Sequence, residues 1–190
     1  ITSRLDIDAI IQQTMAGVNK LLDVEAGSLL LLDELTGELY FRITLRDEHK
    51  EITSYRLRPG EGIAGWVVRQ NRPAIVNDTG ADTRFSPKID RAIGFRTRSI
   101  LCAPLNVRGQ PIGVLELVNK RRGPFTADDK DVLVAVCAAL GIALKNADLY
   151  DVARQRASRN EVVNQVAATI NAQHGLPATT KAIFDQFNRL

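Results

Sequence analysis

The sequence is poor in the residues from which metal centres and thiol catalysts are built. It holds two cysteines, Cys102 and Cys137, and two histidines, His49 and His174. No CxxC or Cys/His ligand spacing occurs, so we expect no metal site. Both cysteines lie in apolar runs without a neighbouring histidine, which favours buried, reduced thiols over nucleophiles.

The signatures of several enzyme classes are missing as well. The phosphate-loop sequence GxxxxGK[ST] does not occur, and no serine lies in a GxSxG elbow. Gly60, Gly62 and Gly65 are interpreted as turn and packing positions before a helix. We therefore expect no catalytic residues in this chain.

Long apolar runs and concentrated charge are also absent. No apolar run approaches the roughly 20 residues that span a bilayer, so we expect no membrane segment and a cytoplasmic location. The net charge is +3, and the basic residues come in small groups without interleaved aromatics, which argues against a nucleic-acid partner. The chain begins at Ile1 without an initiator methionine, and we interpret it as a fragment of a longer protein.

The hydrophobic periodicity predicts an α+β sandwich, in which helices precede, interrupt and follow a sheet. A polar segment from Asn77 to Arg96, with a helical turn at 87–93, is long enough to be a functional lid. The other expected elements are helices at 6–23, 61–70 and from 126 onward, and strands at 28–32, 39–45, 52–57, 74–76, 99–105 and 112–118.

The last predicted helix is unusually long. After Thr126 only Gly141 interrupts it before Gly175, and its apolar residues keep heptad spacing. We predict that residues 127–169 form a linker that dimerises as a coiled coil or connects two domains. The heptad positions are Leu133, Val136, Leu140, Ala143, Ala147 and Tyr150, and the spacing resumes at Val163, Val166 and Ile170.

The two ends of the chain resemble each other. Residues 1–21 align without gaps on residues 170–190, with identities at Ile1/Ile170, Ala9/Ala178, Asn19/Asn188 and Leu21/Leu190. We therefore expect one domain over residues 1–150 and the first helix of a second, truncated copy at 170–190.

Five segments together resemble the GAF domain, a small-molecule sensory module of phosphodiesterases, adenylate cyclases and histidine kinases. They are "GEGIAGWV" (60–67), "DTRF" (82–85), "GFRTRSILCAPL" (94–105), "GVLELVNK" (113–120) and Phe125 with Asp129. The resemblance covers roughly residues 5 to 150 and implies a central antiparallel sheet, helices on both faces and a long C-terminal helix. "GFRTRSILC" looks especially like the tandem GAF regions of cyclic-nucleotide phosphodiesterases.

The resemblance also implies a ligand pocket, with cGMP or cAMP as its ligand. The hydroxyls of Ser28 and Thr97 would contact the ligand, and the amides of Ile63 and Ala64 would receive a phosphate at a helix N-terminus. Ser86 departs from the nucleotide-binding members, which commonly carry an aromatic ring there. The positions similar to the family's pocket are Ser28, Ile63, Ala64, Ser86, Thr97 and Glu116.

Glu116 leaves two alternatives open. Strand alternation places it on one face with Val114 and Val118, so the carboxylate either faces solvent or anchors a ligand inside a pocket. In the second case it could accept two parallel N–H bonds from the edge of guanine, a donor pair that adenine lacks.

The basic turn "NKRRGPFTADDK" (119–130) is better interpreted as a clamp than as an anion site, because consecutive strand residues point to alternating sides. Thr126 fits a helix N-cap, and Lys120 could reach Asp129 across the turn. The family's structural motif corresponds to Asn119, Lys120, Phe125 and Asp129, although Lys130 stands where nucleotide binders often carry glutamate.

Two functions remain at this point. One is a regulatory ligand-binding module that forms a parallel homodimer and relays ligand state to a downstream domain of the same polypeptide. The other is a ligand-free dimerisation or spacer module, in which side chains fill the pocket.

Overall fold

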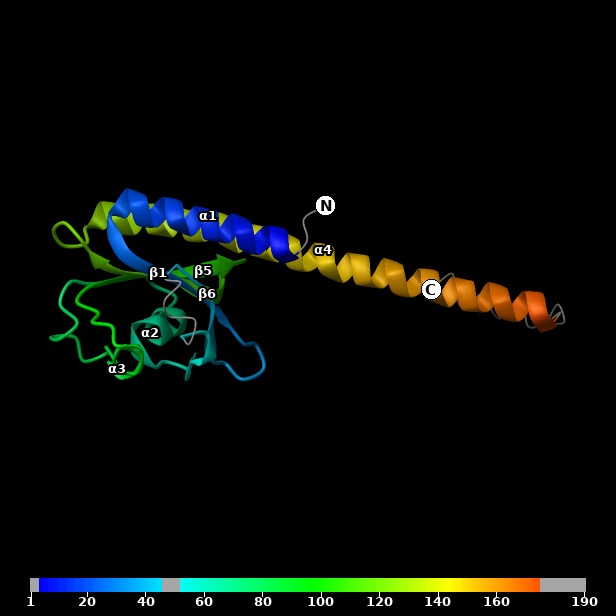
Figure 1. Ribbon diagram of the computed structural model, residues 1–190, viewed down its shortest axis with the longest axis horizontal. Coiled ribbons are helices and arrows are strands. Elements are labelled where there is room, and N and C mark those ends of the chain that lie inside the picture. Colours follow the sequence, from blue (N-terminus) through cyan, green and yellow to red (C-terminus); the bar gives the residue numbers. More distant parts are fainter. Residues whose placement is uncertain (1–3, 46–51, 175–190) are drawn as a thin grey trace. The chain divides into compact units, whose positions relative to one another are not determined.

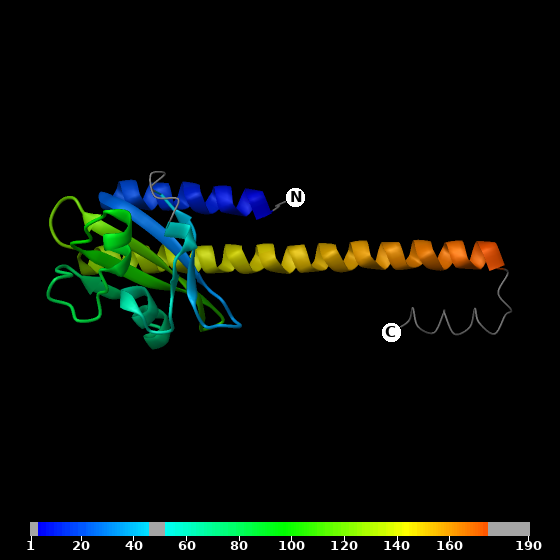
Figure 2. The same ribbon diagram turned by 60° about the horizontal axis from the view of Figure 1, so that its bottom comes forward.

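The computed structural model describes residues 4–45 and 52–174 of the chain. The chain divides into two compact units, residues 1–147 and 148–190. The first unit holds the sheet and the site, and Figures 1 and 2 show its layers. The second unit continues the last helix. The expected second copy at 170–190 lies outside the described residues, apart from the backbone that ends this helix.

The first unit is built on a six-stranded antiparallel sheet with the order β3-β2-β1-β6-β5-β4. This architecture confirms the α+β prediction. The helices are α1 (Arg4–Leu22), α2 (Gly62–Gln70), α3 (Lys88–Ile93) and α4 (Ala127–His174), and the strands are β1 (Val24–Leu32), β2 (Leu39–Thr44), β3 (Arg56–Leu57), β4 (Ala74–Val76), β5 (Ile100–Val107) and β6 (Gln110–Lys120).

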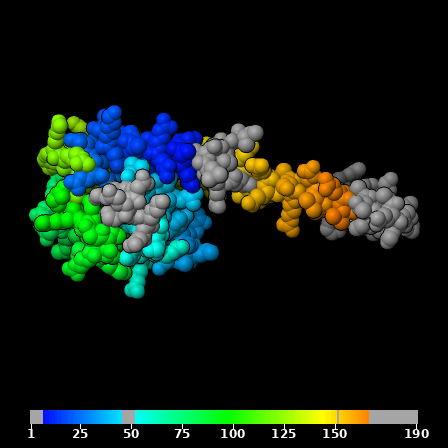
Figure 3. All heavy atoms as spheres, viewed as in Figure 1, coloured from blue at the N-terminus to red at the C-terminus, as the bar shows by residue number. Residues whose placement is uncertain are grey.

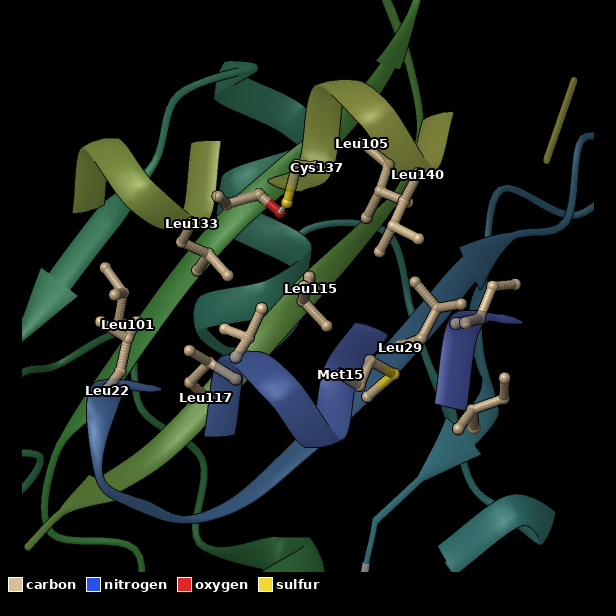
Figure 4. Close-up of a cluster of buried hydrophobic side chains, with 14 of the residues drawn as sticks. Met15, Leu22, Leu29, Leu101, Leu105, Leu115, Leu117, Leu133, Cys137 and Leu140 are labelled. Carbon is tan, nitrogen blue, oxygen red and sulfur yellow. Dashed lines mark hydrogen bonds between the residues drawn. The ribbon is translucent and has the colours of Figure 1, made fainter. Parts of the chain in front are cut away.

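One face of the sheet packs against α1 and the first part of α4. Residues two apart on β6, Leu115 and Leu117, point to this face, because side chains alternate along a strand. Figure 4 shows Met15 of α1 and Leu133 of α4 converging on the same leucines. The resulting core is apolar and sealed from solvent, with both Leu115 and Leu133 at 0% exposure.

The opposite face is covered by α2, α3 and the segment around α3. From the strands it receives the intervening residues, among them Val114 and Val118 of β6, and from α2 it receives Ile63 and Val67. Residues 77–97, hereafter the cover segment, connect β4 to β5 and include α3. In the space-filling view this green segment forms outer surface on the side away from α1 (Figure 3).

The predicted strand at 52–57 is mostly wrong. Only Arg56–Leu57 pairs with β2, while Ile52 begins a tight turn in which the Tyr55 N–H donates to the Ile52 carbonyl at 3.1 Å. Ile52 is nevertheless buried under the sheet. A short apolar run indicates that its residues are buried, and burial alone does not distinguish a strand from a turn.

The long C-terminal helix is confirmed, since α4 runs unbroken from Ala127 to His174. Its first heptad positions serve a purpose other than the predicted seam. Leu133 and Leu140 are buried in the core of the first unit, and Val136 and Ala143 pack against that core. Part of the heptad spacing therefore reflects packing on the domain's own sheet.

Contrary to the expectation from apolar runs, one stretch of α4 within Ala127–Val166 is long and apolar enough to cross a membrane by length and composition. The prediction counted uninterrupted apolar residues, whereas a helix-wide average tolerates a few charged ones. Leu133, Cys137 and Leu140 in this stretch lie in the core. Most of the stretch is exposed, and a single helix that meets this criterion is weak evidence for a span.

Candidate functional site

A cavity of about 100 Å³ lies between the sheet and the cover segment. By this measure a single water needs roughly 10–15 Å³, so the space exceeds that of an isolated buried water. Strands β1, β2, β5 and β6, helix α2 and the cover segment all contribute to its wall. All six residues expected from the sequence line it: Ser28, Ile63, Ala64, Ser86, Thr97 and Glu116.

The strand register places three polar residues in one row across the cavity wall. Ser28 of β1 is paired with Thr44 of β2 on one side and with Glu116 of β6 on the other. All three line the cavity. The sheet thus presents two hydroxyls and a carboxyl side by side, between apolar neighbours such as Ala26 and Val118.

Glu116 is half-buried and lines the cavity, so of the two alternatives the structure favours the pocket position. Among the residues that the structure describes, no hydrogen-bond donor or cation contacts its carboxyl group. Burial, with a smaller contribution from the negative charge of Asp90, raises the pKa of Glu116 from 4.5 to about 7. An unpartnered carboxyl of this kind is costly to keep ionised, and a ligand that donates hydrogen bonds would relieve the cost.

The N-terminus of α2 opens onto the same cavity. Gly62, Ile63 and Ala64 form the first turn and line the cavity, and the residue before them, Glu61, makes no side-chain cap. The Gly65 N–H donates to the Glu61 carbonyl at 3.1 Å, which is the first intrahelical bond. The amides ahead of it are the free donors that favour an anion at a helix N-terminus.

The glycines before α2 serve turn geometry and packing. Gly60 and Gly62 have φ angles of 78° and 68°, in the left-handed region. A Cβ on Gly65 would lie 2.8 Å from the backbone of Gly60, so only glycine fits there. The spacing is literally GxGxxG, but the preceding β3 belongs to an antiparallel pair and not to the parallel βαβ unit of a dinucleotide site.

The cover segment brings side chains that the sequence interpretation missed. Lys88 and Asp90 of α3 line the cavity, as do Phe85 and Phe95 on either side of the helix. An aromatic ring is therefore present although Ser86 carries none. "FSPKID" gave a usable signal, because a lone lysine and aspartate in a suspected lid are candidates for ligand contact.

Thr97 contacts the cavity with its side chain already engaged. Its N–H donates to Asp90 Oδ2 at 2.7 Å and its hydroxyl donates to Asp90 Oδ1 at 2.8 Å. Thr97 therefore fixes α3 to the start of β5. A ligand could still reach the remaining lone pair of its hydroxyl oxygen.

The turn after β6 holds the strand and α4 together. Lys120 Nζ lies 2.5 Å from Asp129 Oδ2, and both side chains are mostly buried. Asp129 also accepts from the Thr126 N–H at 2.8 Å, while its own N–H donates to the Thr126 hydroxyl. Burial alone would raise the pKa of Asp129, but the bonds from Lys120 and Thr126 outweigh it and hold that pKa below its ordinary value.

Neither cysteine is suited to thiolate chemistry. Burial raises the pKa of Cys102 well above its ordinary value and that of Cys137 to about 12. Cys137 donates weakly to the Ala103 carbonyl at 3.7 Å. Within the described ranges, 4–45 and 52–174, no three histidine, cysteine, aspartate or glutamate residues are grouped so as to hold a metal ion.

Comparison with known proteins gives consistent matches. The sequence model described as GAF domain matches residues 6–144. The chain is 34% identical over 181 residues to a probable 3',5'-cyclic phosphodiesterase pde-5 of Caenorhabditis elegans, covering 90% of this chain and 24% of that protein. It is 30% identical to a dual 3',5'-cyclic-AMP and -GMP phosphodiesterase 11 of Drosophila melanogaster, covering 90% of this chain and 13% of that protein.

Among solved structures, the GAF domain of a phosphoenolpyruvate-protein phosphotransferase from Coxiella burnetii has a similar fold. The TM-score is 0.70 at 19% identity, over 77% of this chain and 86% of the other. At this identity the likeness concerns the fold alone. The chain spans a quarter or less of the length of these two phosphodiesterases.

Proposed function

This chain belongs to the GAF domain family, and we propose that its cavity binds a cyclic nucleotide, with cGMP preferred over cAMP. We further propose that α4 relays the ligand state to a domain further along the same polypeptide. The relation of this chain to part of two cyclic-nucleotide phosphodiesterases is consistent with a regulatory, sensory role rather than a catalytic one.

The observation that carries the proposal is the unpartnered carboxyl of Glu116 in the cavity wall. Guanine presents two adjacent N–H donors, which match the two oxygens of a carboxylate in the manner of a bidentate pair. Adenine presents an acceptor at one of these positions. Ser28 and Thr44, in the same row, offer hydroxyls that can adapt to donors or acceptors on the ligand.

The phosphate would lie at the N-terminus of α2, where the amides of Ile63 and Ala64 line the cavity. Lys88 lies at the same part of the wall, with its Nζ 3.9 Å from Glu61 Oε1. At that distance the pair is weak, so Lys88 is available to a phosphate oxygen. Phe85 and Phe95 supply ring faces for the base in place of the aromatic residue that Ser86 lacks.

The proposed relay uses a parallel homodimer formed through α4. In the second unit the helix exposes apolar side chains at a spacing suited to helix pairing. These residues are Leu149, Tyr150, Val152, Val162, Val163 and Val166. The names of the two relatives suggest a cyclic phosphodiesterase as the downstream domain.

Calorimetric titration of the purified chain with cGMP and cAMP tests the ligand. We expect cGMP to bind more tightly, and Glu116→Gln to reduce that preference by about tenfold, because one good bidentate contact is worth roughly 1–3 kcal/mol. Glu34→Gln, an exposed glutamate on the β1–β2 turn, is the matched control and should change nothing. If no cyclic nucleotide binds or raises the melting temperature, the chain is better described as a ligand-free dimerisation module.

Analytical ultracentrifugation tests the homodimer. The wild-type chain should sediment as a dimer, and Val163→Glu with Val166→Glu should shift it to monomer, because two charges would enter the helix seam. Circular dichroism checks that the variant keeps its helix. A wild-type monomer at high concentration would contradict the proposed homodimer.

A further inference from the structure

The first residue of the cover segment is hydrogen-bonded directly to the residue that precedes the cap of α4. Asn77 Nδ2 donates to the Phe125 carbonyl at 3.1 Å, and the Phe125 N–H donates to Asn77 Oδ1 at 2.7 Å. One amide side chain thus satisfies both backbone groups of Phe125, whose side chain is buried at 3% exposure. The contact joins residues that are 48 positions apart in the sequence. It has little freedom to adjust, because both the donor and the acceptor of the Asn77 amide are used.

The two ends of the cover segment are also tied to each other. The Thr79 hydroxyl donates to the Thr97 carbonyl at 2.7 Å, and the Thr79 N–H donates to the Arg98 carbonyl at 3.1 Å. Thr97 in turn holds the carboxylate of Asp90 on α3 with two donors. A displacement of α3 therefore acts on Thr97, on Thr79 and, two residues earlier, on Asn77.

Asn119 forms a second connection between the end of the cover segment and α4. The buried Asn119 amide donates to the Arg96 carbonyl at 2.9 Å and accepts from the Arg98 N–H at 2.7 Å, so it grips the backbone on both sides of Thr97. The next residue, Lys120, pairs with Asp129 of α4. The Asn119 route joins α4 at its third residue, whereas the Asn77 route joins it before the first.

We propose that Asn77 is a positioning residue that couples the cover of the cavity to the start of α4, in parallel with the Lys120–Asp129 clamp. The ligand-dependent part of this proposal rests on the proposed function. The link itself consists of hydrogen bonds within the chain, so it can be tested without adding a ligand.

Amide hydrogen exchange in a double-mutant cycle tests the link without any ligand. Asp90→Ala releases α3 from Thr97, and Asn77→Ala breaks the contact with Phe125. In the wild-type background we expect Asp90→Ala to accelerate amide exchange of residues 130–137. In the Asn77→Ala background the factor of acceleration should be smaller by about threefold or more. Phe125 is left out of the readout because its amide loses its acceptor directly.

Asn71→Gly is the matched control. Asn71 also donates a side-chain hydrogen bond to a distant carbonyl, that of Gly109 at 3.1 Å, and its φ of 49° suits glycine. In this background the effect of Asp90→Ala should be unchanged. If the effects of Asn77→Ala and Asp90→Ala simply multiply, the sites are independent and the proposal is overturned. Should Asn77→Ala fold poorly, Thr79→Val interrupts the same route one step earlier and decides in the same way.

Adding cGMP separates this proposal from the previous one. With the wild type, cGMP should slow exchange in both the cover segment and residues 130–137. With Asn77→Ala it should bind with an affinity within about threefold of the wild type and protect the cover segment, but protect residues 130–137 less. Equal protection of residues 130–137 in both proteins would overturn the coupling role. If the wild type binds no cGMP, the proposed function fails, while the ligand-free cycle still decides on Asn77.

Discussion

The two faces of the sheet differ in the polarity of the strand residues that point to them. On the face toward α1 and α4, Leu29, Leu115 and Leu117 are fully buried among apolar neighbours. On the face toward α2 and α3, the alternate residues of the same strands include Ser28 and Glu116 and border a cavity. A single strand, β6, therefore supplies a dry core and a polar site by alternation.

The difference separates stability from recognition within one sheet. The face toward α1 and α4 gains from dispersion and from burial of apolar area, because its strand residues Leu29, Leu115 and Leu117 are fully buried. The cavity face leaves Glu116 unpartnered among the described residues, which costs stability and creates capacity for a ligand. Substitutions on the face toward α1 and α4 should therefore mainly lower the free energy of unfolding, and substitutions on the cavity face should mainly change ligand affinity.

Leu115→Ala should have the largest effect on stability. It opens a cavity in the dry core, and we expect the free energy of unfolding to fall by about 3–5 kcal/mol. Urea denaturation measures this loss. Cyclic GMP affinity should stay near the wild-type value, because the side chain points away from the site. Val118→Ala, on the cavity wall, should show the reverse: a smaller stability loss and altered affinity. Equal binding defects in both variants would mean that the faces are not separable.

Lys120→Met removes the clamp that joins the sheet to α4. Because Asp129 would be left buried without its cation, we expect a loss of about 3 kcal/mol. Lowering the pH should shrink this difference, since protonation of Asp129 removes the stranded charge. The ratio of cGMP to cAMP affinity should not change. A changed ratio at unchanged stability would instead place Lys120 in ligand selection.

Glu116→Gln should stabilise the ligand-free protein at pH 8. The pKa of Glu116 is raised from 4.5 to about 7 in the folded state. The stability that protonation of Glu116 contributes is therefore fully present below about pH 4.5 and is lost as the pH rises through about 7. Glutamine removes that loss, which amounts to up to about 3 kcal/mol at 1.36 kcal/mol per unit of pKa. Thermal melts of both proteins at pH 5 and pH 8 measure it. Parallel pH profiles for the two proteins would contradict a buried carboxyl.

The affinity for cGMP should depend on pH through the same group. The ionised carboxylate accepts the two guanine N–H groups, so affinity should fall about tenfold for each pH unit below about 7. Calorimetry at pH 6, 7 and 8 measures the slope. Glu116→Gln should bind weakly at all three values, and a wild-type affinity that does not vary would exclude the carboxylate as the base reader.

Arg84→Met should have the smallest effect. The Arg84 guanidinium lies 4.4 Å from the centre of the Trp66 ring and forms a two-point contact with Asp82, so it fastens the cover segment to α2. The side chains remain partly exposed, and we expect a loss of about 1 kcal/mol in the melting analysis. A loss as large as that of Leu115→Ala would mean that the cover is as essential to folding as the dry core.

The sequence predicted much of the fold because its signals are local. Alternation in "VLELV", the turn at Arg108 and Gly109, and the cap at Thr126 each act over a few residues, and the structure contains all three elements. The failures are also local. The run from Ile52 is buried without forming a strand, and the heptad positions Leu133 and Leu140 face the domain's own core instead of a free seam.

By itself the sequence determined which residue types could meet at a site, and the six positions implied by the resemblance all line one cavity. It left open whether Glu116 faces solvent, and it gave no sign of a role for Asn77. Only the tertiary structure decided these points. Burial of a strand face depends on what covers it, and the contact between Asn77 and Phe125 joins positions 48 residues apart that no periodicity relates.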